Sequence, residues 1–166
     1  MTAAHLNQIA AFARGLNSRI EEELQSSFGR SLSELTALVS IQNCDQFHIG
    51  WLAQTLSLKH SSAVRVVDRL EQDGLISRLD KDAKKQVGLV ITRSGTMLAK
   101  KVLALRAQIT ASYLAPMTEA EQKTMARIVE PVIRAHTTTS KDLYRHCALC
   151  DDGVCANCPA GSELSE

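Results

Sequence analysis

The amino-acid sequence predicts a mainly α-helical protein with one small β-hairpin. Apolar residues recur at the spacing of amphipathic helices through most of residues 5–135. Two short apolar runs, 75–79 and 86–92, flank a charged tip at 80–85, which is typical of a hairpin. Turn and capping residues separate the periodic stretches, so each helix has an expected start and end.

The N-terminal part is expected to form two helices. The first thirty residues predict one long amphipathic helix that Gly29 ends. Its apolar residues are Leu6, Ile9, Ala13, Leu16, Ile20, Leu24 and Phe28. Ser31 and Glu34 have the spacing of a capping box, so a second helix is expected from there to about Gln42.

The middle of the chain is expected to hold two shorter amphipathic helices and the hairpin. The helices lie between Phe47 and Gln72 and are separated at 58–60. The second starts near Ser61-Ser62, and Asp73-Gly74 is a strong signal for its end. The hairpin follows directly, so this region has the order helix, helix, hairpin.

The C-terminal half is expected to contain two more helices and a tail. One helix begins at Arg93-Ser94-Gly95 and ends before Pro116. Thr118 with Glu121 opens the last helix. Pro131 lies inside its pattern and is expected to kink or interrupt it. The polar run 137–140 then separates the helices from a cysteine-rich tail.

Length and composition limit the class of protein. A chain of 166 residues is one ordinary domain, or one domain with an appendage, and needs no disulfides to fold. It has no charged-then-apolar leader and no apolar run near membrane-spanning length, so we expect a cytoplasmic protein without membrane contact. In a reducing cytoplasm, clustered cysteines favour metal or redox chemistry over structural disulfides.

The charge is unevenly distributed although its net value is only +1. Residues 59–93 carry eight basic and five acidic side chains, whereas residues 141–166 carry two basic and five acidic ones. A basic middle with an acidic tail is consistent with a polyanion-binding surface and a separate appendage.

The order of the middle elements, two helices and then a hairpin with a basic tip, is that of a winged helix-turn-helix. In such a fold the second helix of the pair enters the major groove of DNA, and the hairpin tip reaches the neighbouring backbone or minor groove. The alternative is a solvated amphipathic helix followed by an ordinary surface hairpin. The predicted DNA-contacting residues are Lys59, His60, Ser61, Ser62, Arg65, Arg69, Arg78, Lys81, Lys84 and Lys85.

Parts of this region resemble the MarR (multiple antibiotic resistance regulator) family of bacterial transcription factors. The most specific stretches are Val66-Val67-Asp68-Arg69-Leu70-Glu71-Gln72-Asp73-Gly74-Leu75-Ile76-Ser77-Arg78 and Thr92-Arg93-Ser94-Gly95. The resemblance extends over roughly residues 5–135. It implies a homodimer on a near-palindromic operator of double-stranded DNA, with repression relieved by a ligand or an oxidant. A small-molecule effector would bind between the DNA-binding lobe and the dimer helices.

The resemblance also implies how the chain is divided. Residues 1–30 and 94–140 would be dimerisation helices, 31–93 the winged helix-turn-helix lobe, and 141–166 an additional cysteine-rich tail. The hairpin tip departs from the family, which commonly has Asp-x-Arg where this chain has Ala83-Lys84-Lys85. Because lysine lacks the planar fork of arginine, these lysines are suited to phosphate contacts rather than base reading.

Four of the five cysteines form two C-x-x-C pairs in the tail. Cys147, Cys150, Cys155 and Cys158 are predicted to bind one metal, with zinc preferred. Only four residues separate the pairs, which is tight for one zinc ion, so an iron–sulfur cluster and metal-free redox disulfides stay open. The alternative without a function is a disordered tail. His146 is a candidate to replace one sulfur as a ligand.

The remaining chemistry is sparse. Cys44 is a candidate oxidant sensor, although an inert thiol is the commoner role for a lone cysteine. No Ser-His-Asp order, glycine-rich phosphate loop or H-E-x-x-H motif is present, so we expect no enzyme. Two alternatives to a regulator are a thiol-redox or metal-binding protein that uses the C-x-x-C pairs, and a winged-helix adaptor for protein contacts.

Overall fold

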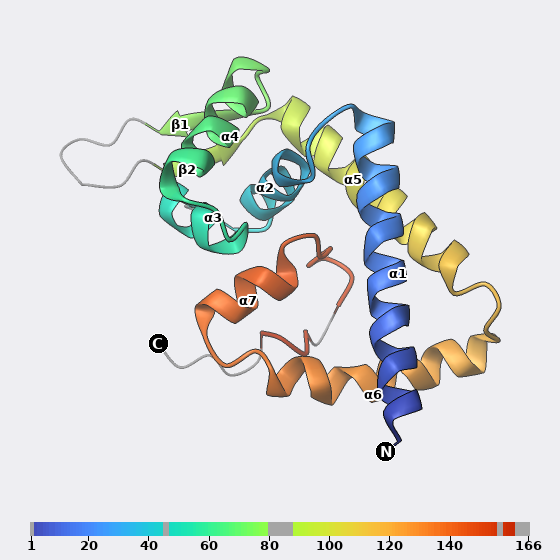
Figure 1. The fold of residues 1–166 in the computed structure, drawn as a ribbon. Helices are drawn as coiled ribbons and strands as arrows, with labels where there is room; N and C mark the ends of the chain where they lie inside the picture. Colours follow the sequence, from blue (N-terminus) through green and yellow to red (C-terminus); the bar gives the residue numbers. More distant parts are fainter. Residues whose placement is uncertain (1, 45–46, 80–87, 156–157, 162–166) are drawn as a thin grey trace.

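The computed structural model describes residues 2–44, 47–79, 88–155 and 158–161 (Figure 1). Its elements in chain order are α1 (Ala3–Phe28), α2 (Leu32–Gln42), α3 (Ile49–Thr55), α4 (His60–Gln72), β1 (Ile76–Leu79), β2 (Gly88–Ile91), α5 (Arg93–Tyr113), α6 (Glu119–Ala135) and α7 (Ser140–Cys147). The strands form a two-stranded antiparallel sheet. The predicted fold class, mainly helical with a hairpin wing, is confirmed.

Capping residues set the helix ends where the sequence placed them. Gly29 follows α1 in the left-handed conformation, with φ of 60°. Ser31 and Glu34 make both bonds of a capping box at the start of α2, and Thr118 and Glu121 do the same for α6. The predicted starts of α2 and α6 are therefore confirmed.

Helix α2 is the centre of a small lobe that also contains α3, α4 and the hairpin. Seven of its residues from Leu35 to Ile41 are buried, and they pack with Leu52, Val67 and Leu70 of the two following helices. The sheet pairs Ile76 with Ile91. The lobe thus has one continuous apolar core that fixes α4 and the wing relative to each other.

The long helices outside the lobe differ from it in arrangement and burial. Helices α1 and α5 lie across each other beside the lobe, whereas α6 extends away from the hairpin (Figure 1). No described residue of α6 is buried, and Ile128 and Val132 are 61% and 55% exposed. Within the described part of the chain, this amphipathic helix has no cover over much of its apolar surface.

The structure differs from the sequence predictions at three places. Helix α6 continues through Pro131, so the expected interruption is wrong; the loss of one backbone hydrogen bond is tolerated because the turns on both sides continue. Helix α4 starts at His60, slightly before the expected Ser61. Helix α7 was not predicted at all. Among the described residues, no helix is long and apolar enough to cross a membrane.

Candidate nucleic-acid interface and C-terminal thiol cluster

Helix α4 buries one face in the lobe and turns the other outward. Ala63, Val67 and Leu70 are fully buried, whereas His60, Ser61 and Arg65 are exposed and Ser62 is half-buried. This separation follows from the helical period, which places the polar residues on the face opposite the apolar ones. The outward face therefore carries the short polar and basic side chains that the sequence analysis placed on DNA.

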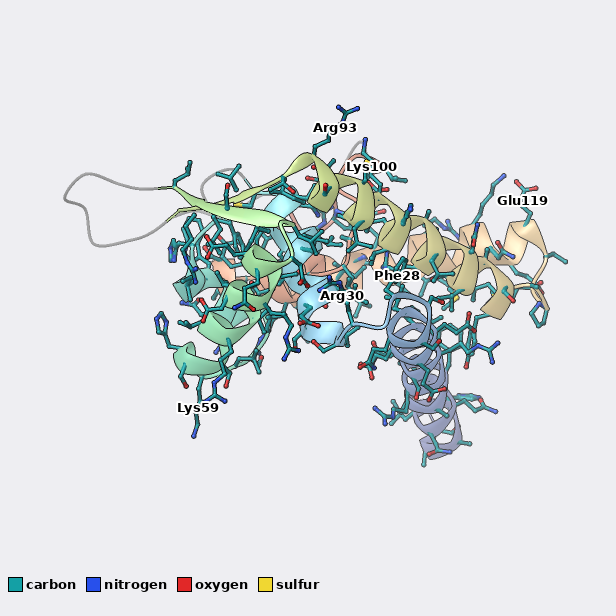
Figure 2. The ribbon with its side chains drawn as sticks, turned by 90° about the horizontal axis from the view of Figure 1, so that it is seen from above. Phe28, Arg30, Lys59, Arg93, Lys100 and Glu119 are labelled. Atoms are coloured by element: carbon teal, nitrogen blue, oxygen red, sulfur yellow. The ribbon has the colours of Figure 1, made fainter. Side chains whose placement is uncertain are left out.

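The start of α4 is suited to an anion. Lys59 is its N-cap, makes no side-chain capping bond, and points away from the ribbon in Figure 2. The first turn contains no acidic residue. Unpaired backbone N–H groups and the helix dipole give this end a partial positive charge, which attracts a phosphate.

The turn between α3 and α4 contains a residue whose left-handed conformation was not predicted from the sequence. Ser57 has φ of 53°, a left-handed conformation that glycine or asparagine adopts more easily. The Leu58 N–H donates to the carbonyl of Ala53 at 2.9 Å and closes the turn. No glycine or asparagine marks this position in the sequence, so no local signal predicted the conformation.

The structure gives two predicted DNA-contacting arginines partners within the lobe. The Arg69 guanidinium is 3.2 Å from the carboxylate of Glu34 and stays 68% exposed. Arg78 of β1 forms ion pairs with Asp68 and Glu71 of α4. Arg78 therefore connects the wing to α4, and a DNA contact by either arginine stays a prediction.

The remaining predicted contacts belong to the hairpin tip. Lys81, Lys84 and Lys85 lie outside the described residues. The described part of the wing is anchored from both sides: Leu79 pairs with Gly88, and the Leu89 N–H donates to the carbonyl of Phe47 at 2.7 Å.

The C-terminal tail folds back onto the lobe through α7 (Figure 1). The Tyr144 ring lies 5.6 Å from that of Trp51 on α3 and 6.1 Å from that of Phe47, measured between ring centroids. Aromatic pairs at such separations are favourable beyond the area that they bury. Trp51 thus joins α3 of the lobe to α7 of the tail.

Three hydrogen bonds also attach the tail to the lobe. Ser40 Oγ donates to the carbonyl of Ala148 at 3.3 Å, and Asn43 Nδ2 donates to that of Cys150 at 2.8 Å. Arg145 donates to Ser57 Oγ at 2.9 Å, and Ser57 is the left-handed residue in the turn before α4. None of these anchoring residues was identified from the sequence; the Thr139-x-x-Asp142 capping pattern was the available signal for α7.

The four tail cysteines lie in one neighbourhood. Burial, followed by the nearby thiols of Cys150 and Cys158, raises the pKa of Cys147 to about 11. Burial also raises the pKa of Cys150, which interacts with Cys155 and Cys158. All five cysteines lie in the described part of the chain, and no disulfide joins any of them.

The thiols are not arranged as a finished metal site. Among the described residues, no group of three or more His, Cys, Asp or Glu side chains is placed so that it could hold a metal ion. His146, the candidate substitute ligand, has its Nδ1 2.7 Å from Thr137 Oγ1. A hollow of about 340 Å³ adjoins the cluster, and Cys147, Cys158, Asn43, Tyr144 and Cys44 are among its lining residues.

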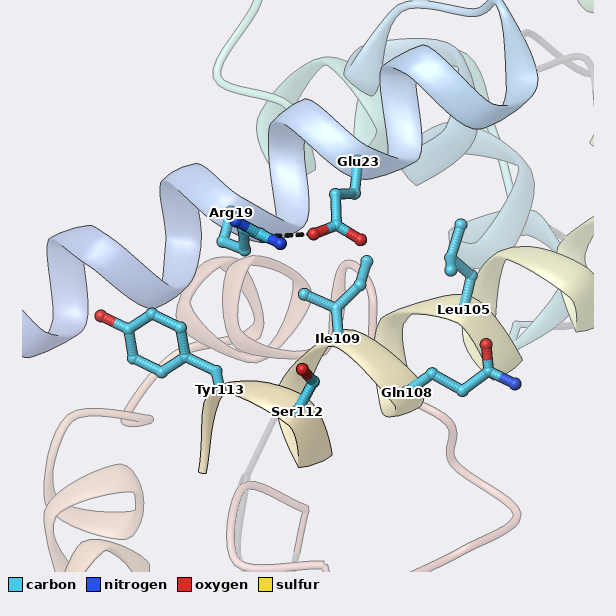
Figure 3. A pocket seen from close by; sticks show the side chains of 7 residues that line it. All are labelled: Arg19, Glu23, Leu105, Gln108, Ile109, Ser112 and Tyr113. Atoms are coloured by element: carbon cyan, nitrogen blue, oxygen red, sulfur yellow. Dashed lines mark hydrogen bonds and ion pairs between the residues drawn. The ribbon is translucent and has the colours of Figure 1, made fainter. Parts of the chain in front are cut away.

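A second hollow of about 490 Å³ lies between α1 and α5 (Figure 3). Arg19 and Glu23 line one side and form an ion pair with each other, while Ile109 and Tyr113 of α5 line the other. Because the arginine charge already has a partner one helical turn away, the hollow does not present an uncompensated cation to a ligand.

Comparisons with known proteins agree with this geometry. The sequence profile described as MarR family matches residues 31–85, which span α2, α3, α4 and the first strand of the wing, β1. The HTH-type transcriptional repressor MdtR of Bacillus subtilis (strain 168) is 29% identical over 140 residues, covering 82% of this chain and 90% of that protein. The DNA-binding lobe of this chain matches the MarR family. This family consists of non-enzymatic transcription regulators, so the prediction that the chain is not an enzyme is confirmed.

Solved MarR family structures share the fold. A MarR family protein from Bacillus stearothermophilus superposes with a TM-score of 0.71 at 18% identity, covering 83% of this chain and 99% of that one. A Mycobacterium tuberculosis MarR family protein in complex with p-aminosalicylic acid superposes with a TM-score of 0.63 at 21% identity, covering 80% of this chain and 98% of that one. This chain therefore has residues beyond those that it shares with these relatives.

Proposed function

We propose that this MarR family regulator is a repressor that binds a near-palindromic operator as a homodimer. The observation that carries the proposal is the outward face of α4, where exposed His60, Ser61 and Arg65 stand on a helix held rigidly by the core of the lobe. The similarity to a transcriptional repressor supports the direction of regulation.

The dimer follows from the exposed apolar surfaces of the long helices. Met117, Met125 and Ile128 line an apolar hollow on α6, and Leu6 and Ile9 near the start of α1 are more than half exposed. MarR family proteins bind DNA as homodimers. A second copy would cover these surfaces and place two α4 helices on successive major grooves.

The proposed repressor responds to a signal. A small-molecule effector is one source, since a relative has been solved with p-aminosalicylic acid. The tail cysteines are another: Cys147, Cys150, Cys155 and Cys158 would hold a metal, zinc in preference to an iron–sulfur cluster, or would oxidise to disulfides without metal. The contacts of the tail with α3 and Ser57 support a signal from this position.

The test compares variants on two DNAs, an operator selected from a random pool and unrelated DNA of equal length. Arg65→Ala should cost about 1–3 kcal/mol on the operator and less on unrelated DNA if Arg65 contacts a base edge. Arg127→Ala is the matched control, because Arg127 is also exposed but lies on α6. Equal losses on both DNAs would make Arg65 a phosphate contact instead.

The wing is tested separately. The double variant Lys84→Ala and Lys85→Ala should weaken binding to both DNAs and flatten the dependence of the binding constant on salt, because phosphate contacts release counterions. If the wild-type chain selects no DNA from the pool at low salt, the repressor proposal fails and the winged-helix adaptor is favoured.

A further inference from the structure

We propose that Cys147, Cys150, Cys155 and Cys158 bind one thiophilic divalent cation of the zinc class, and that this cation locks the C-terminal tail onto the DNA-binding lobe. The binding half of the proposal is independent of DNA. Only the regulatory half rests on the proposed repressor function.

The four thiols form one connected set. Cys147 hydrogen-bonds to Cys158 and interacts electrostatically with Cys150. Cys150 in turn interacts with Cys155 and Cys158. These interactions therefore run between the two C-x-x-C pairs as well as within the first pair, and Cys147 and Cys158 line the same hollow. Four cysteine sulfurs in one neighbourhood are the donor set that zinc accepts in tetrahedral sites.

Residues other than cysteine hold the backbone at the first C-x-x-C pair, and the chain is buried again just beyond the second. The Cys150 N–H donates to the carbonyl of Cys147 at 2.9 Å, which closes the first turn. Asn43 fixes the carbonyl of Cys150 from α2, and Ala160 beyond the second pair is only 6% exposed. The backbone of the first pair is thus held in place, so gathering the four sulfurs around one cation would involve rotation of thiol side chains and adjustment around exposed Cys155.

Two of the thiol side chains have room for this rotation. Cys147 and Cys158 line the same hollow of about 340 Å³. Asn43 lines it as well, and its buried Oδ1 accepts no hydrogen bond within the described residues. A hollow with two thiols on its wall allows them to turn without displacing the apolar core.

The contacts of the tail explain how an occupied site would act on DNA binding. Tyr144 packs on Trp51 of α3, and Arg145 donates to Ser57 in the turn that leads into α4. Both residues precede Cys147 by at most three positions. A cation that fixes the cysteines would therefore reduce the motion of the turn that sets the direction of α4, and its loss would release that turn.

The binding half is tested with full-length protein purified without oxygen, stripped of metal and titrated with Co(II) and then with Zn(II). We expect one cation per chain, thiolate-to-cobalt absorption in the near ultraviolet, and displacement of cobalt by zinc. Cys155→Ser should weaken binding and reduce this absorption without harming the fold, because Cys155 is exposed. Cys44→Ser is the matched control and should bind as the wild type does.

Three results would overturn the binding half. These are unchanged cobalt absorption after replacing all four tail cysteines with serine, the visible spectrum of an iron–sulfur cluster with no zinc uptake, and disulfides in protein that never binds either cation. Circular dichroism of each variant shows whether the helices have formed, so loss of the site is separated from loss of the fold.

The regulatory half is tested by operator affinity with and without stoichiometric Zn(II). We expect a change of about tenfold or more, which Arg145→Ala should reduce while cobalt absorption stays intact. Equal affinities of the two forms would overturn this half while leaving the repressor proposal standing. Cation binding by a chain that selects no DNA would instead refute the repressor proposal and leave the metal site standing.

Discussion

Thr92 and Gly95 show why a short motif that resembles the MarR family is needed for the fold. The Thr92 hydroxyl accepts from the Gly95 N–H at 3.1 Å and donates to the carbonyl of Gly74 at 2.7 Å. These bonds join the start of α5 to the end of α4. A Cβ on Gly95 would lie only 2.0 Å from the carbonyl oxygen of Leu75, so α5 can begin this close to the wing only with glycine.

Gly95→Ala is therefore expected to destabilise the protein. Ordinary helix propensity favours alanine, but the clash with backbone at Leu75 outweighs it, and we expect a loss of about 1–3 kcal/mol in the free energy of unfolding. Urea denaturation followed by circular dichroism measures the loss. Ser94→Ala, at the exposed neighbouring position, is the control. Equal stabilities of the two variants would show that the close contact relaxes without cost.

Arg78 is expected to contribute to stability through its position between the wing and α4. Its ion pairs with Asp68 and Glu71 are partly exposed, so each is worth about 0.2–1 kcal/mol. A double-mutant cycle with Arg78→Met and Asp68→Asn should give a coupling energy in this range. A coupling energy of zero, together with a large loss of operator affinity for Arg78→Met, would assign Arg78 to DNA instead.

At the scale of elements, the sequence predicted the helices and the hairpin because periodicity and caps are local signals. Gly29, Ser31 and Thr118 each mark an end through bonds to residues within four positions. The docking of Tyr144 on Trp51 was missed because it depends on a contact distant in sequence. The left-handed conformation of Ser57 was missed because no glycine or asparagine marks that position. The outward residues of α4 could be predicted because amphipathic spacing separates them from the core. The ion pairs of Arg78 with Asp68 and Glu71 were not predicted.

Helix α7 is expected to depend on its capping box. The hydrogen bond from the Thr139 side chain is the main cause that holds the pKa of Asp142 below its ordinary value. A carboxylate whose pKa is lowered in the folded state contributes its full stabilisation at pH values above its ordinary pKa. This contribution is lost as the pH falls through the lowered pKa. Acid should therefore weaken α7 first at its N-terminus.

Thr139→Ala tests this cap. The pKa of Asp142 should rise towards its ordinary value in a carboxyl NMR titration, because the largest stabilising bond to the charged form is gone. Thr138→Ala is the matched control and should raise it less, since the Thr138 bonds contribute less. A larger rise for Thr138→Ala would contradict the assignment of the cap.

At the scale of the whole molecule, one apolar core joins the lobe to α1 and α5, whereas the described residues of α6 stay outside it. Helix α2 is almost completely buried between the lobe and α5, and α6 buries none of its described residues. The tail is attached to the lobe through α3 and to α6 through the connection at 136–139. If two copies pair through α6 as proposed, a change in that pairing would reach the tail, and a change in the tail would reach the pairing.

Ile128→Glu is expected to separate the homodimer into monomers. Ile128 is 61% exposed on the apolar face of α6, and burying a carboxylate in a dimer interface costs far more than the isoleucine contributes. Ala126→Glu adds the same charge three residues from Lys123, on the polar face, and serves as the control. Sedimentation at micromolar concentration should show a monomer for Ile128→Glu and a dimer for Ala126→Glu. Because one α4 cannot reach both halves of a near-palindromic site, the monomer should also lose most of its operator affinity; a stable dimer for both variants would place the interface elsewhere.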